Sequence, residues 1–151
     1  MPETQFVIFK LNEEEYGVNI EQVQEIGSYQ KATFVTNSPE FIQGIINLRN
    51  IVIPIINLKA RFKITNNDVI DENTRMIVVN ISEGQFGFVV DDASEVISID
   101  ENDIEETPEM LRGAGRRYIS GIGKVGDRLL VLLDMDQLLN EEEQRQIETL
   151  K

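Results

Sequence analysis

The sequence of 151 residues contains no histidine, no cysteine and no tryptophan. These absences exclude Cys–His and Ser–His–Asp nucleophile systems, together with the histidine- and cysteine-ligated sites in which proteins usually hold zinc. Carboxylates, lysines, serines and tyrosines remain, so catalysis is narrowed without being excluded. The lack of cysteine fits a reducing compartment but does not require one.

Basic residues are also scarce: 14 lysines and arginines stand against 27 acidic residues, and the net charge is −13. Because recognition of phosphate needs a basic surface, this balance argues against binding to nucleic acid or directly to an anionic membrane. The N-terminus does not resemble a signal peptide, and no apolar stretch reaches the roughly 20 residues that span a bilayer. We therefore expect a soluble, cytoplasmic protein, whose charge suits partners with basic patches.

Short apolar runs, rich in β-branched and aromatic residues and bounded by turn residues, recur along the whole chain. This pattern is typical of a barrel or sandwich, so we predict a mostly β fold. Helical spacing appears in two places. Ile20, Val23 and Ile26 fit a short helix, and the segment from Asp134 to Leu150 fits a C-terminal helix, in which these apolar residues would face the core: Met135, Leu138, Leu139, Ile147 and Leu150.

The chain carries an internal repeat. A shift of 70 residues aligns segment 6–26 with 76–96, where all ten apolar positions match and Gly17 and Glu25 meet Gly87 and Glu95. A shift of 77 aligns segment 41–56 with 118–133, where Gly44 meets Gly121. We expect two similar β-subdomains, approximately 12–72 and 73–140, with the N-terminal strand as a candidate to cross over between them. The polar segment 64–74 is not a flexible linker, so the halves should be fused.

A single charge, Arg49, interrupts the most hydrophobic stretch of the sequence, residues 41–58. In the second copy the aligned pair is Gly126-Asp127, a strong two-residue hairpin turn, and asparagine at 50 tolerates the positive φ that such turns require. We therefore predict Arg49 at an exposed hairpin tip. Glycine at the equivalent turn suggests that the fold does not need an arginine there, which favours a functional role. The alternatives are a solvated turn residue or an internal ion pair with Glu25.

Four segments, in this order, resemble the bacterial chemotaxis coupling protein family CheW: YGVNIEQVQEI, FIQGIINLRNIVIPIINLKARF, GFVVDDASEVISI and YISGIGKVGDRLLVLLDMDQLL. The resemblance covers residues 5 to 140. The family usually has Asn-Leu-Arg-Gly and then Asp-Leu-Arg. This chain has Asn50 for the glycine and Asn57-Leu58-Lys59 for the second motif, which puts in doubt any salt bridge made at 57 or 59.

The resemblance implies two intertwined SH3-like five-stranded β-barrels within one CheW-like domain over residues 1–151, ending in an acidic helix or tail at 141–151. It implies a non-catalytic adaptor, without a cofactor, that couples the cytoplasmic tips of chemoreceptors to the regulatory domain of the histidine kinase CheA. That domain is homologous to the coupling protein, so the two can pack edge to edge in rings. Recruitment to membrane-receptor arrays would follow without direct membrane binding.

Carried over by position, the resemblance assigns receptor contacts to five residues at a groove between the subdomains: Val23, Glu25, Arg49, Ala93 and Val96. We expect Arg49 on the hairpin tip and the other four on a short helix and its equivalent in the second copy. A receptor helix would lay apolar side chains against exposed aliphatic residues, while one arginine holds a carboxylate bidentately. The spacing of Val23 suits burial in the core equally well.

The resemblance places kinase contacts at Ile42, Gln43 and Gly44, and a second contact, for ring assembly, at these residues of the other half: Gly121, Gly126 and Asp127. Gly44 and Gly121 have a simpler explanation, because glycine in a strand often marks a bulge or a close approach of another backbone.

The acidic residues invite a catalytic or metal-binding interpretation, which the spacing does not favour. Asp91 and Asp92 are adjacent in an expected strand and would point to opposite faces. The acidic run 100–106 lacks the glycine and glutamate positions of an EF-hand. A carboxylate-based small β-barrel hydrolase therefore remains a distant alternative. The nearer alternatives are a coupling domain of another sensory system, such as pilus-driven motility, and a regulatory domain cut from a larger kinase, although Met1 and the acidic tail lead us to expect an intact chain.

Overall fold

The computed structural model describes residues 2–64, 70–81, 84–111, 118–140 and 142–145. The first half of the chain forms these elements in order: β1 (Glu3–Leu11), β2 (Glu14–Asn19), the 3-10 helix η1 (Ile20–Gln22), β3 (Val23–Ser28), β4 (Ile42–Leu48), β5 (Ile51–Ile56) and α1 (Leu58–Arg61). The second half repeats this order with additions: β6 (Arg75–Ile81), β7 (Gly84–Val90), β8 (Asp92–Asp100), η2 (Glu101–Asp103), β9 (Ile104–Glu105), η3 (Glu109–Leu111), β10 (Ile119–Val125), β11 (Arg128–Leu133) and η4 (Met135–Gln137). The prediction of a mostly β fold is confirmed.

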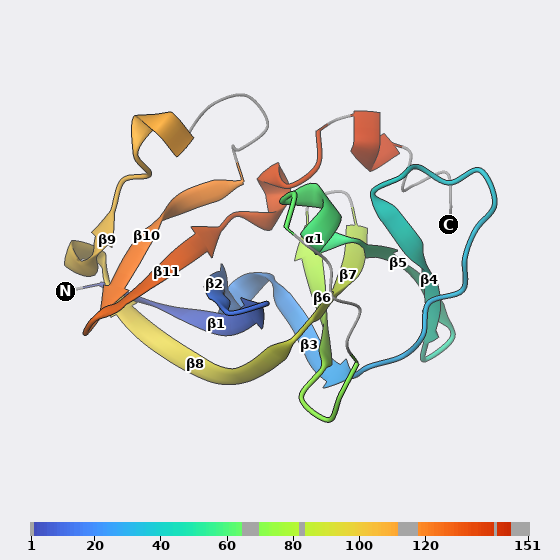
Figure 1. The fold of residues 1–151 in the computed structure, drawn as a ribbon, viewed down its shortest axis with the longest axis horizontal. Coiled ribbons are helices and arrows are strands. Elements are labelled where there is room, and N and C mark those ends of the chain that lie inside the picture. The colour runs from blue at the N-terminus through green and yellow to red at the C-terminus, as the bar shows by residue number, and fades with distance from the viewer. Residues whose placement is uncertain (1, 65–69, 82–83, 112–117, 141, 146–151) are drawn as a thin grey trace.

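The strands form two sheets that lie beside each other (Figure 1). The terminal sheet has the order β8-β1-β2-β11-β10-β9, and the middle sheet has the order β3-β6-β7-β5-β4. No pairing between named strands in the described ranges joins the two edges of either sheet. Two sheets therefore match the two expected subdomains, and closure into barrels stays a prediction.

The halves of the chain exchange hairpins. The β1–β2 hairpin pairs with β8 and β11 of the second half, and the β6–β7 hairpin pairs with β3 and β5 of the first half. The terminal sheet therefore takes its strands from residues 3–19, 92–105 and 119–133, and the middle sheet takes its strands from residues 23–28, 42–56, 75–81 and 84–90. The expected boundary near residue 72 does not separate the two sheets. Two hairpins with the same apolar pattern fit either set of strands, so the pattern could not assign the partners.

The exchange explains the glycines shared by the two copies. Gly17 lies opposite Leu132 in the parallel pair of β2 and β11, and Gly87 lies opposite Ile55 in the parallel pair of β7 and β5. A Cβ atom would lie 2.9 Å from Leu132 Cδ2 at Gly17 and 3.0 Å from Ile55 Cδ1 at Gly87. Each junction between a hairpin and the strands of the other half thus needs the space that glycine leaves.

The largest core cluster draws residues from both sheets and both halves. A row of aromatic rings runs through it, with centroids 5.7 Å apart for Phe9 and Tyr16, 5.5 Å for Tyr16 and Phe62, and 4.7 Å for Phe62 and Tyr118. Smaller clusters lie within the terminal sheet, around Phe6 and four neighbours, and within the middle sheet. The shared cluster therefore holds the two sheets together.

Two helix predictions need correction. Val23–Ser28 forms strand β3, which pairs with β6, and only Ile20–Gln22 is helical. Pairing with a neighbouring strand outweighs a helical spacing that rests on three residues. The expected helix from Asp134 to Leu150 is interrupted: η4 ends at Gln137, and helical structure resumes at residues 142–145. Met135, Leu138 and Leu139 are buried, as expected. Ile147 and Leu150 lie outside the described ranges.

Among the described residues, no helix is long and apolar enough to cross a membrane.

Candidate functional site

Arg49 and Asn50 form the two-residue turn between β4 and β5, with φ angles of 51° and 70°. This confirms the predicted hairpin tip. The Arg49 side chain is 72% exposed, and its two Nη atoms donate to the two carboxylate oxygens of Glu25, with Nη2 at 3.2 Å from Oε2. The hydrogen bonds that Arg49 donates to Glu25, together with the negative charge of that carboxylate, raise the pKa of Arg49. The alternative interpretation, an internal ion pair between Arg49 and Glu25, is therefore confirmed, while much of the Arg49 side chain stays exposed to solvent.

The second half carries an equivalent arginine that the sequence comparison missed. Arg128 is the first residue of β11 and lies two positions after Gly126, the aligned counterpart of Arg49. It binds Glu95, the counterpart of Glu25, with Nη2 at 2.8 Å from Oε1, and also binds Glu15 on β2. The inference that the fold does without an arginine at this hairpin is therefore wrong. Inspecting neighbours of the aligned turn, rather than the aligned position alone, would have found Arg128.

The remaining receptor-facing candidates lie on strands, not on helices. Val23 is on β3 and Ala93 and Val96 are on β8. Val23 and Ala93 are partly buried against the largest core cluster, which agrees with the core alternative for Val23, whereas Val96 is 50% exposed. The structure brings Glu25 and Arg49 together and places Ala93 and Val96 on the other sheet. That all five line one groove remains a prediction.

The predicted kinase contacts at Ile42 and Gly44 need correction, because neither residue presents a surface. Ile42 is buried in the core, and a Cβ on Gly44 would lie 2.5 Å from the carbonyl oxygen of Thr33, whose backbone pairs with Ile45. Only Gln43 of this group is exposed. The pairing of β4 with β5 shifts register between Ile42 and Gly44, so glycine there serves the backbone, as the simpler explanation holds.

The predicted contact at Gly121 needs the same correction, because this glycine also serves the backbone and presents no surface. It is buried, and a Cβ there would lie 2.9 Å from Ile104 Cγ2 and 3.1 Å from the carbonyl oxygen of Glu105. The register of β10 against β11 shifts between Ile119 and Gly121. Gly126 and Asp127, by contrast, form the exposed turn between β10 and β11.

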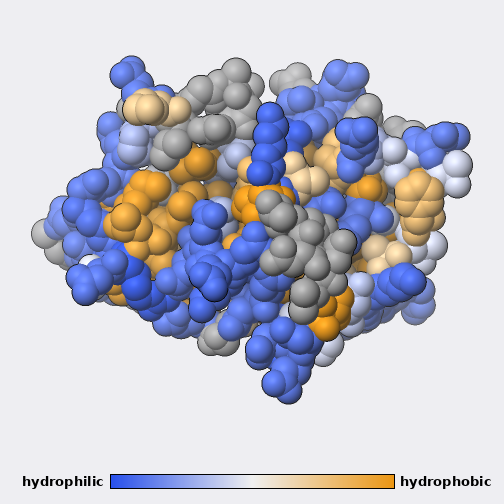
Figure 2. All heavy atoms as spheres, viewed as in Figure 1, coloured by the Kyte–Doolittle hydropathy of each residue, from blue (hydrophilic) through white to orange (hydrophobic). Residues whose placement is uncertain are grey.

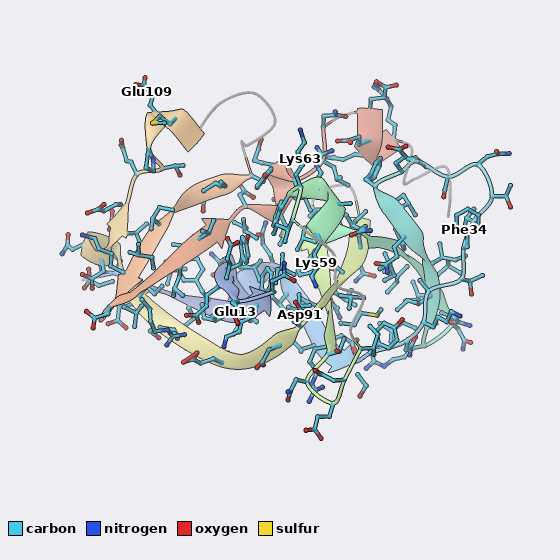
Figure 3. All side chains as sticks on the ribbon, in the orientation of Figure 1. Glu13, Phe34, Lys59, Lys63, Asp91 and Glu109 are labelled. Atoms are coloured by element: carbon cyan, nitrogen blue, oxygen red, sulfur yellow. The ribbon has the colours of Figure 1, made fainter. Side chains whose placement is uncertain are left out.

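Exposed apolar side chains that the sequence analysis did not single out lie near both hairpins. Val52 on β5 and its aligned counterpart Leu129 on β11 are both exposed, Leu129 to 65%. On the face seen in Figure 2, apolar surface gathers over β10 and β11. Phe34, labelled in Figure 3, is 73% exposed, and Met110 in η3 is 91% exposed. Phe34 follows Thr33, which pairs with β4, and Met110 lies in the segment after β9, which pairs with β10. Exposed apolar side chains that gather on a surface are typical of protein-binding sites.

The doubt about a salt bridge at position 59 is resolved. Lys59 Nζ lies 2.9 Å from Asp91 Oδ2, and the two side chains point toward each other from α1 and from the residue before β8 (Figure 3). Asn57 accepts a hydrogen bond from the backbone N–H of Ala60 and caps α1. The backbone N–H of Asn12 also donates to Asp91. The Asp91 carboxylate is thus a structural partner of a lysine.

Asp92 faces a different environment, a polar hollow that it lines with Lys10, Glu15, Glu95 and Arg128. The hydrogen bonds from Arg128 hold the pKa values of Glu15 and Glu95 below their usual range, and the two carboxylates raise the pKa of Arg128. Both carboxylates are engaged by the arginine, so neither is poised as an acid or base. Within the described parts of the chain, no three acidic side chains gather in a way that could hold a metal ion.

Two β-sheets with a shared core, ion-paired hairpins and exposed apolar side chains near both hairpins are typical of a protein-binding module. A family model described as the CheW-like domain matches residues 5–143, and the chain belongs to this family. The chemotaxis protein CheW of Klebsiella aerogenes is 41% identical over 92% of this chain and 83% of its own length.

Two further relatives support this assignment. The chemotaxis protein CheW of Bacillus subtilis is 35% identical over 90% of this chain and 86% of its own length. The crystal structure of the scaffolding protein TtCheW from Thermoanaerobacter tengcongensis is similar with a TM-score of 0.82 and 35% identity, and the match covers 95% of this chain and 92% of that one.

Proposed function

We propose that this protein is a cytoplasmic adaptor in chemotaxis that joins the tips of chemoreceptors to the regulatory domain of the histidine kinase CheA, without catalysis or a cofactor of its own. Its relatives are named as chemotaxis proteins, and a similar protein of known structure is named as a scaffolding protein. The observation that carries the proposal is the Arg49–Glu25 pair, a charged group that the hairpin holds in the open beside exposed apolar residues.

The receptor surface is proposed around this pair. A receptor tip that is helical would present an apolar stripe and a few charges. Ile26, which follows Glu25 on β3, and Val96, its aligned counterpart on β8, are exposed aliphatic residues on edge strands. Each points to the face opposite its neighbouring glutamate, so a helix would meet both groups by lying along the strand edge. Arg49 is already oriented by Glu25, so it can offer its outer face to a carboxylate with little loss of side-chain freedom.

The kinase surfaces are proposed at the hairpins of the two halves. Gln43 of the original assignment stays there, joined by the exposed residues Ile51 and Val52 of the β5 strand. In the second half the surface comprises the turn residues and one exposed apolar neighbour: Gly126, Asp127 and Leu129. A kinase domain of the same fold would offer matching hairpins, so contacts at both surfaces would alternate the two proteins in a ring.

The test is co-sedimentation of the purified protein with a receptor cytoplasmic fragment and, separately, with the kinase regulatory domain. We expect binding of both by the wild type, and loss of receptor binding alone by Arg49→Glu. The matched control is Lys124→Glu, which reverses an exposed, ion-paired cation on the β10–β11 hairpin. If the wild type binds neither partner at micromolar concentrations, the proposed function fails. If Arg49→Glu binds the receptor like the wild type, the assignment of Arg49 fails.

A coupling domain of another sensory system would give a different result in the same assay. It would bind the receptors of that system and leave the chemoreceptor fragment in the supernatant.

A further inference from the structure

Arg128 joins strands that are not neighbours in the terminal sheet. Its Nε and Nη2 atoms donate to Glu15 on β2 at 3.1 and 2.5 Å, and its Nη1 and Nη2 atoms donate to Glu95 on β8 at 3.2 and 2.8 Å. In the sheet order β8-β1-β2-β11, two strands separate β8 from β11. The guanidinium therefore reaches across the sheet and ties its edge strand to the β10–β11 hairpin.

The edge strand is irregular where the arginine holds it. In the pairing of β1 with β8, Ile8 lies opposite Glu95 but Lys10 lies opposite Asp92, so the register shifts between these pairs. A bulge interrupts the hydrogen-bonded ladder and lets a strand bend. Since β1 is the only partner of β8 among the described strands, the contact between Glu95 and Arg128 is an important restraint on this part of the strand.

Both ends of the Arg128 cluster, defined as Arg128 with Glu15 and Glu95, adjoin surfaces proposed above for partners. Val96, exposed on β8, follows Glu95 directly. The exposed turn residue Asp127 precedes Arg128, and the exposed Leu129 follows it. A partner that displaces β8 at Val96 therefore pulls on the group that fixes the start of β11, and the reverse also holds.

We propose that the Arg128 cluster couples these two surfaces, so that a receptor helix bound along β8 raises the affinity of the β10–β11 hairpin for the kinase domain. Arg128 is in this sense a positioning residue that acts through β8 and β11. The inference rests on the proposed function, because it takes its two partners from there. Coupling between binding sites is reciprocal, so the kinase domain must raise the affinity for the receptor by the same factor.

The chain offers a matched control on the same hairpin. Lys124 on β10 lies 2.5 Å from Glu105, but this pair joins only the neighbouring strands β10 and β9. Lys124→Gln removes one positive charge from the hairpin, as Arg128→Gln does, but it breaks a single exposed ion pair and leaves β8 untouched, whereas Arg128→Gln breaks the pairs with Glu15 and Glu95.

The experiment measures the dissociation constant of the receptor fragment with and without a saturating concentration of the kinase regulatory domain. We expect a ratio of about five-fold or more for the wild type and for Lys124→Gln, and a ratio near one for Arg128→Gln. Arg128→Lys should keep only part of the ratio, because an ammonium group cannot bind two carboxylates with the fork of a guanidinium. Glu95→Gln leaves the hydrogen bonds between Arg128 and Glu15 in place and should also lower the ratio. This variant tests the proposal if Arg128→Gln does not fold.

Two outcomes overturn the coupling and leave the proposed function intact: a wild-type ratio of one despite binding of both partners, or a full ratio in a folded Arg128→Gln or Glu95→Gln protein. An equal loss in Lys124→Gln also overturns it, because surface charge alone would then explain the effect. If the wild type binds neither partner separately, the proposed function fails first, and the coupling falls with it.

Discussion

Arg49 and Arg128 perform the same task in the two halves of the chain, from positions two residues apart in the repeat. Arg49 extends from the β4–β5 hairpin to Glu25 on β3, and Arg128 extends from the β10–β11 hairpin to Glu95, the aligned glutamate on β8. Arg128 binds a second carboxylate, Glu15, and is less exposed than Arg49. At the residue scale the halves therefore differ in how open the arginine is: Arg49 is available to a partner, whereas Arg128 is held between two carboxylates of its own chain.

The Arg128 ion pairs predict how stability depends on pH. Arg128 lowers the pKa values of Glu15 and Glu95 in the folded state. The stabilisation from these ion pairs is therefore complete above the unfolded-state pKa of about 4.5, and it is lost as the pH falls through the folded-state pKa values. We expect the free energy of unfolding to change little between about pH 6 and 8, because the chain has no histidine.

Urea unfolding from pH 3 to 8 measures this dependence. In Arg128→Gln the acid loss should be shallower than in the wild type, whereas Lys124→Gln should follow the wild-type curve. An unchanged acid profile in Arg128→Gln would contradict the assigned role of the cluster.

Glycine at the hairpin junctions gives a second prediction at the residue scale. In Gly87→Ala the new methyl group meets Ile55 Cδ1 at 3.0 Å and the carbonyl oxygen of Ile77 at 3.3 Å, so we expect a loss of about 1–3 kcal/mol in stability. Gly27→Ala is the control, since its nearest neighbour is a Glu25 carboxylate oxygen at 3.9 Å. Calorimetry should show a clearly lower Tm for Gly87→Ala only. Equal Tm values for both variants would argue against the close packing of β5 and β7.

At the scale of elements, the apolar runs predicted most strands and both hairpin turns. They failed where helical spacing was read into β3, because three apolar residues at such spacing also fit a strand that pairs with β6. The exchange of hairpins was out of reach of the residue pattern, since β1–β2 and β6–β7 are interchangeable in it. The repeat made only the N-terminal strand a candidate to cross over, and the resemblance alone implied fully intertwined subdomains. Of the candidate site, Arg49 could be placed at its turn from sequence. The burial of Gly44 and Gly121 depends instead on Thr33 and on β9, distant segments that pair with the neighbouring residues of β4 and β10. The burial of Ile42 depends on the shared core cluster.

The C-terminal segment is an element whose docking can be tested. Glu143 accepts two hydrogen bonds from Arg61, at 2.6 and 2.8 Å, and exchanges two more with the backbone and side chain of Asn140. The Arg61–Glu143 pair is mostly shielded from solvent, so we expect Glu143→Gln to cost about 1–2 kcal/mol. Glu142→Gln, at an exposed neighbour, should cost almost nothing. Chemical unfolding measures both, and equal stabilities would show that the segment is not docked through Arg61.

At the scale of the whole molecule, the exchange makes each sheet depend on both halves of the chain. The core cluster also joins the sheets through Phe9, Tyr16, Phe62 and Tyr118. We therefore expect a single unfolding transition, in which amides of the terminal and middle sheets exchange through the same global opening. Hydrogen exchange should show Gly87→Ala, a change in the middle sheet, accelerating the slowest amides of β1 and β2 as much as those of β6. Protection lost in the middle sheet alone would show that the sheets unfold separately.

The central claim is that this protein bridges two partners. The most direct measurement is the amount of CheA that sediments with chemoreceptor-containing membranes as this protein is added. The account predicts that the sedimented kinase rises with the wild type to saturation, and that Arg49→Glu fails to raise it while still binding the kinase regulatory domain in solution. Kinase sedimentation that does not depend on this protein, or that Arg49→Glu supports as well as the wild type, would contradict the account.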